Sequence, residues 1–467
     1  MALLTFIGAI QQVTGSCYRI ETRDGTKVLL ECGMRQGRRE DEAHNSEAFA
    51  FDPLSLDAVV LSHAHIDHSG LLPRLAAKGY RGPIFATSAT CELLELMLMD
   101  AAHIQEKDAE WESRWRARLG KPAVKPLYTA VDAERALGLR RAVEYGEPVE
   151  VARGVTVTFH DAGHILGSAI VEMEVHDHNL TRRLVFSGDL GNTCSPLMRD
   201  PTPLSEADVV LMESTYGDRD HRCTPDTLDE LAEILAQAQR DGGNVLIPAF
   251  SVGRTQDLLF YLGQFYQQGR LPQQAVFLDS PMAIKANAIY QRFHEHFDPK
   301  DRELLRQNGV SRIEDWLPIL RCTPEPEDSM AINRIESGAI IIAGSGMCNG
   351  GRIVHHLKHN LWRKECHIVF PGFQARGTLG RAIVDGAPTV RVLRQRVAVK
   401  AQVHTLGGFS AHAGQSQLLD WVKHFDHRPE LYLVHGEVEK MKVLQQALHD
   451  RLQWTANIPE PGEQIAL

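Results

Sequence analysis

The chain has 467 residues, 43% of them hydrophobic and 24% charged. This length is enough for two or more domains with large cores, and the sequence has too few apolar runs for a membrane protein. Its 50 basic and 60 acidic residues give a net charge of −10, which is unfavourable for a purely electrostatic nucleic-acid binder. The eight cysteines form no Cys-x-x-Cys pair and the apolar start lacks basic residues, so we expect a reduced, cytoplasmic protein without a signal peptide or a thiolate zinc site.

The first two hundred residues alternate apolar runs with turns and charged helical stretches. Their pattern predicts the following elements: a β-meander over 1–60, a helix over 71–99 broken by a strand at 83–86, a charged helical stretch over 100–145, and strands at 149–159 and 169–175.

From about residue 207 the pattern changes to strands that alternate with helices. Strands are predicted at 208–212, 244–248, 275–278 and 339–343, and a helix near 254–268. This alternation is typical of a mainly parallel sheet. The last seventy residues return to short strands, including 431–434, and the whole chain contains neither repeats nor low-complexity linkers.

The densest polar cluster is the run Ser62-His63-Ala64-His65-Ile66-Asp67-His68-Ser69-Gly70, directly after a strand-like apolar stretch at 57–61. Loops at the carboxyl ends of strands are where α/β folds place their chemistry. Imidazole and carboxylate are the usual ligands of zinc and similar ions, and four such groups are costly to bury without a metal. The pattern therefore favours a metal site over a polar surface loop.

Four more polar residues follow apolar strand runs, namely His164, Asp189, Glu213 and His435. Each alone would more often be a cap or a satisfied core residue. Glycines flank His164 at positions 163 and 167, which suggests tightly packed backbone near a ligand. Together with the first cluster, these residues supply enough nitrogen and oxygen ligands for two metal ions.

The run His-x-His-x-Asp-His, with His164 and Asp189 far downstream, resembles the metallo-β-lactamase fold. The resemblance implies two Zn²⁺ ions, with Mn²⁺ as an alternative for these ligands. One carboxylate that bridges both ions fits the roughly 3.5–4 Å separation of two-metal hydrolases. The implied ligands are His63, His65 and His164 for one ion, Asp67, His68 and His435 for the other, and Asp189 as the bridge.

Other segments resemble the β-CASP nucleases. Glu213-Ser214-Thr215-Tyr216-Gly217 is similar to motif A, Phe409-Ser410-Ala411-His412 to motif B, and Leu433-Val434-His435-Gly436-Glu437 to motif C. Histidine in motif C favours the RNA-processing branch, which includes the cleavage subunit of the pre-mRNA 3′-end machinery and its bacterial and archaeal relatives. One departure is Glu31, where the family has an aspartate that orients the first metal cluster; this substitution bears on metal occupancy.

This resemblance implies an α/β fold in which a metallo-β-lactamase αββα sandwich, residues 1–206 and 396–467, carries an inserted β-CASP domain, residues 207–395, with a mainly parallel sheet. The implied activity is zinc-dependent hydrolysis of phosphodiester bonds in single-stranded RNA, endonucleolytic, with 5′-to-3′ exonucleolytic cleavage left open. Hydroxide activated by two metals would leave a 5′-phosphate and a 3′-hydroxyl. The implied catalytic residues are Asp67, His412 as the acid, and Glu213 as the residue that orients His412.

Candidate substrate-binding residues lie in or near turns that contain glycine or serine, where backbone amides and arginines bind phosphate. They are Ser214, Arg254, Ser345, Arg352, Arg376, Thr378 and Arg381. Basic residues further along extend this stretch: Arg391, Arg394, Arg396 and Lys400. An ordinary solvated surface is the alternative for any single arginine. His355 and His359 have helical i,i+4 spacing but lack the zinc-protease glutamate, so we expect them on a helix surface.

Three alternatives remain at this stage. A small-molecule hydrolase of thioester or lactam type would not need the long insertion or motifs A to C. A catalytically silent RNA-binding paralogue would have lost metal ligands, whereas every matched ligand is present. DNA as substrate stays open because two-metal hydrolysis does not require a 2′-hydroxyl. Single-stranded RNA is the expected partner, without membrane contact, and a homo-oligomer or partners in a processing complex are left open.

Overall fold

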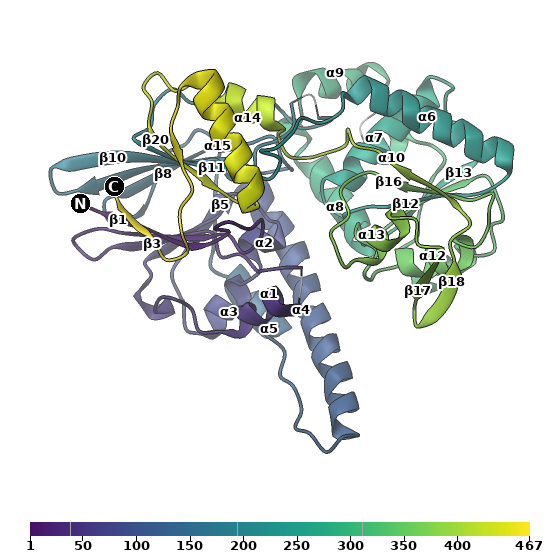
Figure 1. Ribbon diagram of the computed structural model, residues 1–467, viewed down its shortest axis with the longest axis horizontal. Helices are drawn as coiled ribbons and strands as arrows, with labels where there is room; N and C mark the ends of the chain where they lie inside the picture. Colours follow the sequence, from purple (N-terminus) through teal and green to yellow (C-terminus); the bar gives the residue numbers. More distant parts are fainter. Residues whose placement is uncertain (38, 194, 311) are drawn as a thin grey trace. The chain divides into compact units, whose positions relative to one another are not determined.

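The structure is a computed structural model, and it describes all 467 residues except 38, 194 and 311. The chain forms two compact units (Figure 1). The first unit contains Met1–Thr193, Asp200–Asp220 and His412–Leu467, and the second contains Cys194–Arg199 and His221–Ala411. The domain boundaries at 206/207 and 395/396 stay a prediction.

The first unit is built on two seven-stranded sheets. The first sheet has the order β22-β1-β2-β3-β4-β5-β6, with β22 (Gln464–Ala466), β1 (Leu3–Gly8), β2 (Cys17–Glu21), β3 (Lys27–Leu30), β4 (Ala58–Val60), β5 (Ile84–Thr87) and β6 (Arg140–Val143). The second has the order β21-β20-β11-β10-β9-β8-β7, with β21 (Ala456–Asn457), β20 (Glu430–Val434), β11 (Val209–Glu213), β10 (Leu180–Phe186), β9 (Ala169–Asp177), β8 (Val155–Asp161) and β7 (Val149–Ala152).

The two sheets face each other across one apolar core. Alternating residues of both sheets meet there, for example Phe6 and Tyr18 from the first and Phe186 from the second, and all three are at most 1% exposed. Burial of such side chains stabilises the fold by about 1.5–3 kcal/mol each. The outer face of the second sheet is covered by α14 (Gln415–Val422) and α15 (Val438–Leu452).

Helices also lie against the first sheet, so the unit has four layers (Figure 1). They are α1 (Arg39–Ala43), α2 (Ile66–Ser69), α3 (Leu72–Ala77), α4 (Ser88–Ala117) and α5 (Ala130–Leu137), with the 3₁₀ turns η1 (His44–Ser46) and η2 (Pro53–Ser55). This is the predicted αββα sandwich.

The second unit is built on a six-stranded sheet in which every pair of neighbours is parallel. Its order is β14-β13-β15-β12-β16-β19, with β14 (Leu320–Cys322), β13 (Ala275–Asp279), β15 (Ala339–Ala343), β12 (Val245–Pro248), β16 (His367–Phe370) and β19 (Gln402–Thr405). A separate hairpin joins β17 (Thr389–Val392) to β18 (Gln395–Ala398). The predicted parallel sheet is therefore present.

Helices of the second unit follow the strands as the alternating pattern predicts. One face of the sheet packs against α12 (Ile353–Asn360) and α13 (Leu379–Val384). The other helical elements are α6 (Thr224–Asp241), α7 (Arg254–Gln267), α8 (Pro281–Arg292), η3 (His294–His296), α9 (Pro299–Gln307), α10 (Ile313–Trp316) and α11 (Pro326–Ile332).

Four local predictions differ from the structure. Residues 1–60 are not a continuous β-meander, because α1, η1 and η2 lie between β3 and β4. The last seventy residues contain the helices α14 and α15 besides short strands. The stretch 100–145 is not one helical segment, because α4 continues to Ala117 and is followed by a loop, α5 and the strand β6. Asp67 and His68 do not lie in a loop but in the one-turn helix α2, where an acidic residue in the first turn is favourable beside the positive end of the helix dipole. None of the described helices is long and apolar enough to cross a membrane.

Candidate metal centre

The polar residues picked out from the sequence meet at one edge of the sandwich. In the second sheet β8 and β10 are both antiparallel to β9, and β10, β11 and β20 are parallel to one another. The carboxyl ends of these four strands therefore lie on the same side. His164 follows β8, Asp189 follows β10, Glu213 ends β11 and His435 follows β20. The run that begins at Ser62 reaches the same place from β4.

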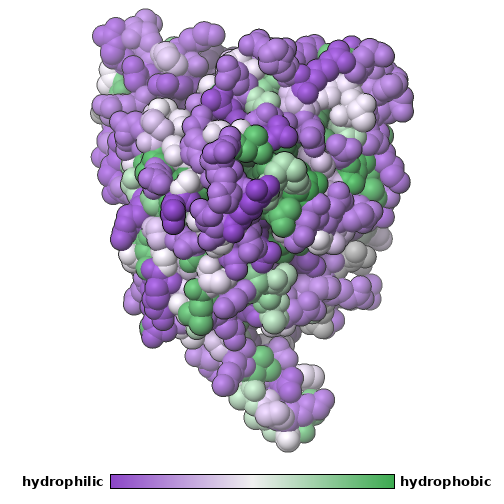
Figure 2. Space-filling view, turned by 90° about the vertical axis from the view of Figure 1, so that its left-hand side faces the viewer, coloured by the Kyte–Doolittle hydropathy of each residue, from purple (hydrophilic) through white to green (hydrophobic). Residues whose placement is uncertain are grey.

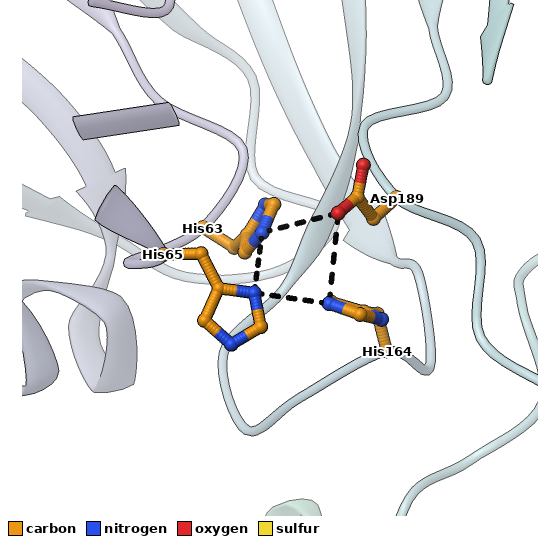
Figure 3. A group of neighbouring side chains, drawn as sticks. All are labelled: His63, His65, His164 and Asp189. Atoms are coloured by element: carbon orange, nitrogen blue, oxygen red, sulfur yellow. Dashed lines mark hydrogen bonds and ion pairs between the residues drawn. The ribbon is translucent and has the colours of Figure 1, made fainter. Parts of the chain in front are cut away.

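A first group of four ligand atoms gathers around one point (Figure 3). Nε2 of His63 lies 3.2 Å from Nδ1 of His65, which lies 3.1 Å from Nε2 of His164. Oδ2 of Asp189 lies 3.5 Å from the His63 nitrogen and 3.6 Å from that of His164. A tetrahedral zinc site with zinc–nitrogen distances near 2.0–2.1 Å separates its ligand atoms by about 3.3–3.4 Å, so the spacing fits.

A second group contains Asp67, His68 and His435 together with the other oxygen of Asp189. Nε2 of His68 lies 3.2 Å from Nε2 of His435 and 3.4 Å from Oδ1 of Asp189. Oδ2 of Asp67 lies 3.5 Å from the His435 nitrogen and 4.0 Å from that of His68. The structure thus gathers all seven predicted ligands in two groups that share Asp189.

The shared carboxylate provides a test of whether these residues fit a metal. Asp189 is 2% exposed, and within the described part of the chain its Oδ1 is a buried oxygen without a hydrogen-bond donor. Buried polar atoms are rarely left unsatisfied, and the nitrogens of His63, His65 and His164 that face one another at 3.2 and 3.1 Å cannot all carry protons. A cation at each group would satisfy these atoms, so the donor set fits two metal ions.

The electrostatics of the two groups favour a bound cation. Burial lowers the pKa of both His63 and His65, which keeps them neutral as metal ligands must be. Burial opposes ionisation of Asp67, but His68 and His435 hold its pKa at about 2. His68 faces the carboxylates of Asp189, Asp67 and Glu31, which raise its pKa well above the usual range despite burial. The second group therefore attracts positive charge.

Glu31 supports the ligands from behind. It is fully buried, accepts hydrogen bonds from the backbone N–H and the hydroxyl of Ser62, and lies 2.5 Å from Nδ1 of His68. The resemblance implies that this residue orients the first metal cluster, and its direct imidazole partner is His68 of the second group. Burial raises the pKa of Glu31, and the charge on His68 opposes that shift. The bond to Nδ1 leaves Nε2 of His68 free for a metal.

Glu31→Gln is expected to weaken metal binding at the second group by about 10–100-fold while the first group stays loaded. The amide keeps the side-chain length but no longer accepts the His68 proton as a carboxylate does. Activity measured against zinc concentration should therefore saturate at a higher concentration than in the wild type. Glu21→Gln, a change of the same kind on β2, is the control. Superimposable zinc titrations of Glu31→Gln and wild type would contradict this role.

Beside the two groups lies a histidine–glutamate pair. Nδ1 of His412 is 3.2 Å from Oε1 of Glu213 and 3.9 Å from Oδ2 of Asp189. Glu213 is fully buried and also accepts a hydrogen bond from the backbone N–H of Leu190. Burial alone would lower the pKa of His412, but the carboxylates of Glu213 and Asp189 raise it to about 9. The pair has the geometry of a proton donor held by a carboxylate.

Close backbone packing fixes the ligand segments. A Cβ on Gly33 would lie 1.7 Å from the carbonyl oxygen of Asp67, and one on Gly191 would lie 2.0 Å from that of Gly163, next to His164. No L side chain can be accommodated at such distances without moving the backbone. These two glycines thus hold the ligand loops at their present positions.

Three family descriptions match the chain. They are the metallo-beta-lactamase superfamily over residues 11–222, the Beta-Casp domain over 255–383, and the Zn-dependent metallo-hydrolase RNA specificity domain over 396–459. Ribonuclease TTHA0252 of Thermus thermophilus is 42% identical over 438 residues, which cover 94% of each chain. The chain belongs to the β-CASP family of metallo-β-lactamase-fold nucleases, in its RNA-processing branch. It is thus a metal-dependent hydrolase.

More distant proteins agree with this family. Transcription termination factor FttA of Methanocaldococcus jannaschii is 30% identical over 94% of this chain and 67% of its own length. The same factor from Thermococcus kodakarensis is also 30% identical, over 99% of this chain and 71% of its own. A crystal structure of a protein of unknown function from Enterococcus faecalis shares the fold, with a TM-score of 0.54 and 13% identity over 100% of both chains.

In the β-CASP unit, the predicted phosphate-binding turns meet at the carboxyl edge of the parallel sheet. β12, β15 and β16 are neighbours, so the turns after them lie side by side. Arg254 donates to the carbonyl of Pro371 at 2.7 Å, and the side chain of Gln374 donates to the carbonyl of Gly346 at 3.0 Å. Ser345 and Thr378 lie in the turns joined in this way, and Thr378 caps α13.

The four predicted arginines differ in how many hydrogen bonds and ion pairs their side chains form. Arg352 pairs with the buried Asp279 at 2.7 Å and also donates to two backbone carbonyls. Arg381 forms a bidentate pair with Asp385, at 3.0 and 2.6 Å. Arg376 is exposed and has no hydrogen bond or ion pair among the described residues. Arg376 is therefore the arginine most available to a phosphate.

The remaining predicted residues have defined positions. Ser214 is buried in the first unit, where its hydroxyl donates to the carbonyl of Val434 at 2.7 Å. On the β17–β18 hairpin, Arg391 and Arg396 are exposed and directly opposite each other. Like charges so placed are unfavourable unless an anion lies between them. His355 and His359 lie exposed on α12, as expected.

The sequence reasoning missed several residues at the site. Thr215 lies 3.2 Å from Nδ1 of His435, Ser62 lies 3.0 Å from Nδ1 of His63, and Ser187 accepts from the backbone N–H of Glu213 at 3.0 Å. Each hydroxyl lies within two residues of a strand-end polar residue in the sequence, which is the signal that could have found it. Two half-exposed aromatic residues, Phe250 and Phe373, lie on the turns after β12 and β16.

Proposed function

We propose that this chain is a zinc-dependent ribonuclease that cuts single-stranded RNA at internal phosphodiester bonds and leaves 5′-phosphate and 3′-hydroxyl ends. Cleavage from a 5′ end is a second mode that the same site would support. The observation that carries the proposal is the pair of ligand groups that share Asp189, with His412 held beside them by Glu213.

Two Zn²⁺ ions would be held by His63, His65 and His164 on one side and by Asp67, His68 and His435 on the other, with Asp189 common to both. When bound, such ions lower the pKa of water and neutralise the charge that develops on phosphoryl oxygens. Glu31, Ser62 and Thr215 keep the imidazole rings in the required orientation.

His412 would give the proton that the leaving 3′-oxygen needs. Its Nδ1 faces Glu213, so its other ring nitrogen carries the proton to be transferred. The carboxylates around it raise its pKa to about 9, which keeps the imidazole protonated near neutral pH. Glu213 acts through His412 and is a positioning residue.

RNA contacts in the β-CASP unit would come from Arg376 and from the aromatic rings of Phe250 and Phe373. Arginine binds phosphate bidentately, and exposed aromatic rings stack on unpaired bases. Arg254, Ser345 and Thr378 would shape the turns that present these side chains, and Arg352 and Arg381 would hold neighbouring segments through Asp279 and Asp385.

The test is cleavage of one end-labelled single-stranded RNA, the matching DNA, and the RNA after chelation. We expect internal RNA cuts with 5′-phosphate ends, lost on chelation and in Asp67→Ala, and retained in the control Asp24→Ala, which changes an exposed carboxylate in the turn between β2 and β3. DNA cut as fast as RNA would favour a DNA nuclease. No RNA cleavage by protein that holds two ions per chain would overturn the proposal.

A further inference from the structure

The second half of α4 is an arm that the metal centre does not use. Up to Ala102 the helix buries residues in every turn, whereas beyond it Ala109 alone is buried among the helix residues. Figure 1 shows this half and the loop after it extending beyond the sheets of the first unit. We call residues 103–125 the α4 arm.

One side of the α4 arm combines basic and apolar side chains. A helix advances about 100° per residue, which places six positions within an arc about 100° wide. They are Ile104, Lys107, Trp111, Arg114, Trp115 and Arg118, all of them exposed. Trp111 is 58% exposed and Trp115 is 51% exposed. The arc contains no acidic residue, so it differs from an ordinary solvated helix face.

The opposite side of the arm is held in place by the loop that returns from its tip. The hydroxyl of Ser113 donates to the carbonyl of Val124 at 3.2 Å and accepts from its N–H at 2.9 Å. Arg116 donates to the carbonyl of Pro122 at 2.9 Å. The loop leaves the basic and apolar side uncovered, because it packs on the other one.

The charge of the arm is opposite to that of the chain. Residues 103–125 contain six basic and four acidic residues, a net charge of +2, whereas the whole chain carries −10. Arg114 pairs with Glu110 at 3.1 Å, but both side chains are exposed. Such a pair contributes little free energy, so another anion can replace Glu110 as the partner of Arg114. Figure 2 shows hydrophobic and hydrophilic residues side by side on the projecting end of the face it draws.

The start of α4, at the end of the helix away from the arm, lies beside the candidate metal centre. Thr87 and Thr90, at the start of α4, donate to the carbonyl of Gly167 at 2.6 and 2.8 Å. Gly167 belongs to the short loop that carries His164. A helix of 30 residues is about 45 Å long, so α4 connects the ligand loop to a distant positive surface within one rigid element.

We propose that the α4 arm is a binding site for single-stranded RNA, in which Trp111 and Trp115 stack on unpaired bases and Lys107, Arg114 and Arg118 contact the backbone. This inference rests on the proposed ribonuclease function and adds a second RNA-binding site, at a distance from the phosphodiester bond that is cleaved. RNA fits this face better than an apolar partner, because the cations alternate with the rings. Helical neighbours four apart have Cβ atoms about 5–6 Å from each other, close enough for consecutive nucleotides.

The experiment measures binding of a fluorescent single-stranded RNA by anisotropy, with the full chain kept metal-free so that no cleavage occurs. Three variants are compared with wild type: Trp111→Ala/Trp115→Ala, Lys107→Gln/Arg114→Gln/Arg118→Gln, and the control Trp362→Ala, which removes an equally exposed tryptophan from the second unit. Metal-loaded protein is assayed in parallel on bis(p-nitrophenyl) phosphate, which is too small to reach the arm from the metal centre.

We expect the double tryptophan variant to bind RNA at least about tenfold more weakly, since stacking on one base contributes a several-fold gain. The triple basic variant should reduce the slope of log affinity against log salt by about 2. Trp362→Ala should bind within twofold of wild type, and the small ester should be hydrolysed equally by all of them.

Unchanged RNA affinity in the double tryptophan variant would overturn the inference and assign the face to a protein or to a second copy of the chain. A wild type that hydrolyses the small ester but neither binds nor cuts RNA would overturn the proposed function as well. The two failures are therefore distinguishable.

Discussion

Asp189→Ala is expected to remove both metal ions at once and to reduce RNA cleavage by at least about a thousandfold. The carboxylate is the one ligand that both groups share, with Oδ2 3.5 Å from Nε2 of His63 and Oδ1 3.4 Å from Nε2 of His68. Burial opposes its ionisation, yet His435 and His68 hold the pKa of Asp189 well below its usual range. Bound metals contribute several kcal/mol to such reactions, which corresponds to at least three powers of ten in rate.

The measurement is metal content per chain by mass spectrometry, together with kcat/KM on RNA. Wild type should hold two ions and Asp189→Ala close to none, whereas His63→Ala should keep the ion of the second group. Asp177→Ala is the matched control, because this carboxylate is also buried but pairs with the N-terminus and Arg23. Two ions retained in Asp189→Ala, or activity within tenfold of wild type, would contradict the bridging role.

The candidate metal ligands could be picked out from the sequence because each follows an apolar strand run. Strands that run in one direction end at one edge of the sheet, so Asp189 and His435, 246 residues apart, become neighbours once β10, β11 and β20 are parallel. The parallel sheet of the second unit follows from the alternation of strands and helices, whereas the αββα sandwich was implied by the resemblance of the motifs.

Contacts that depend on side-chain direction could not be predicted in this way. Glu31 lies beside His68 only because its backbone adopts a positive φ of 65° after β3, which no periodic pattern reveals. The turn arginines look alike in sequence, yet Arg352 faces the buried Asp279 and Arg376 faces solvent. Arginine next to glycine indicates an anion partner but does not say whether that anion is a phosphate or a carboxylate.

The exposure of the α4 arm is a further feature that could not be predicted from the sequence. The charged, helical character of the arm was predicted, but apolar residues on a helix normally pack against the core, and the sequence does not tell which of them find a partner. In the structure Leu94 and Leu98 are buried, whereas Trp111 and Trp115, which lie more than three turns beyond Leu98 and on a different side of the helix, are exposed.

His412→Ala is expected to lower kcat for RNA by about 10²–10⁴-fold while metal content stays at two ions per chain. Nδ1 of His412 lies 3.2 Å from Glu213, and within the first unit the ring is not among the seven ligands of the two groups. Removing it would leave the 3′-oxygen to depart without a proton. His160→Ala, which removes another partly buried histidine paired with a glutamate, is the control.

The choice of leaving group separates proton donation from other roles of His412. p-Nitrophenolate departs without a proton, so bis(p-nitrophenyl) phosphate should be hydrolysed by His412→Ala within about tenfold of the wild-type rate. The kcat of Glu213→Gln on RNA should lie between those of wild type and His412→Ala, because the imidazole of His412 remains but the carboxylate that raises its pKa is lost. Equal losses on RNA and on the nitrophenyl ester would mean that His412 acts on binding or on the metals, and the acid would then have to come from elsewhere.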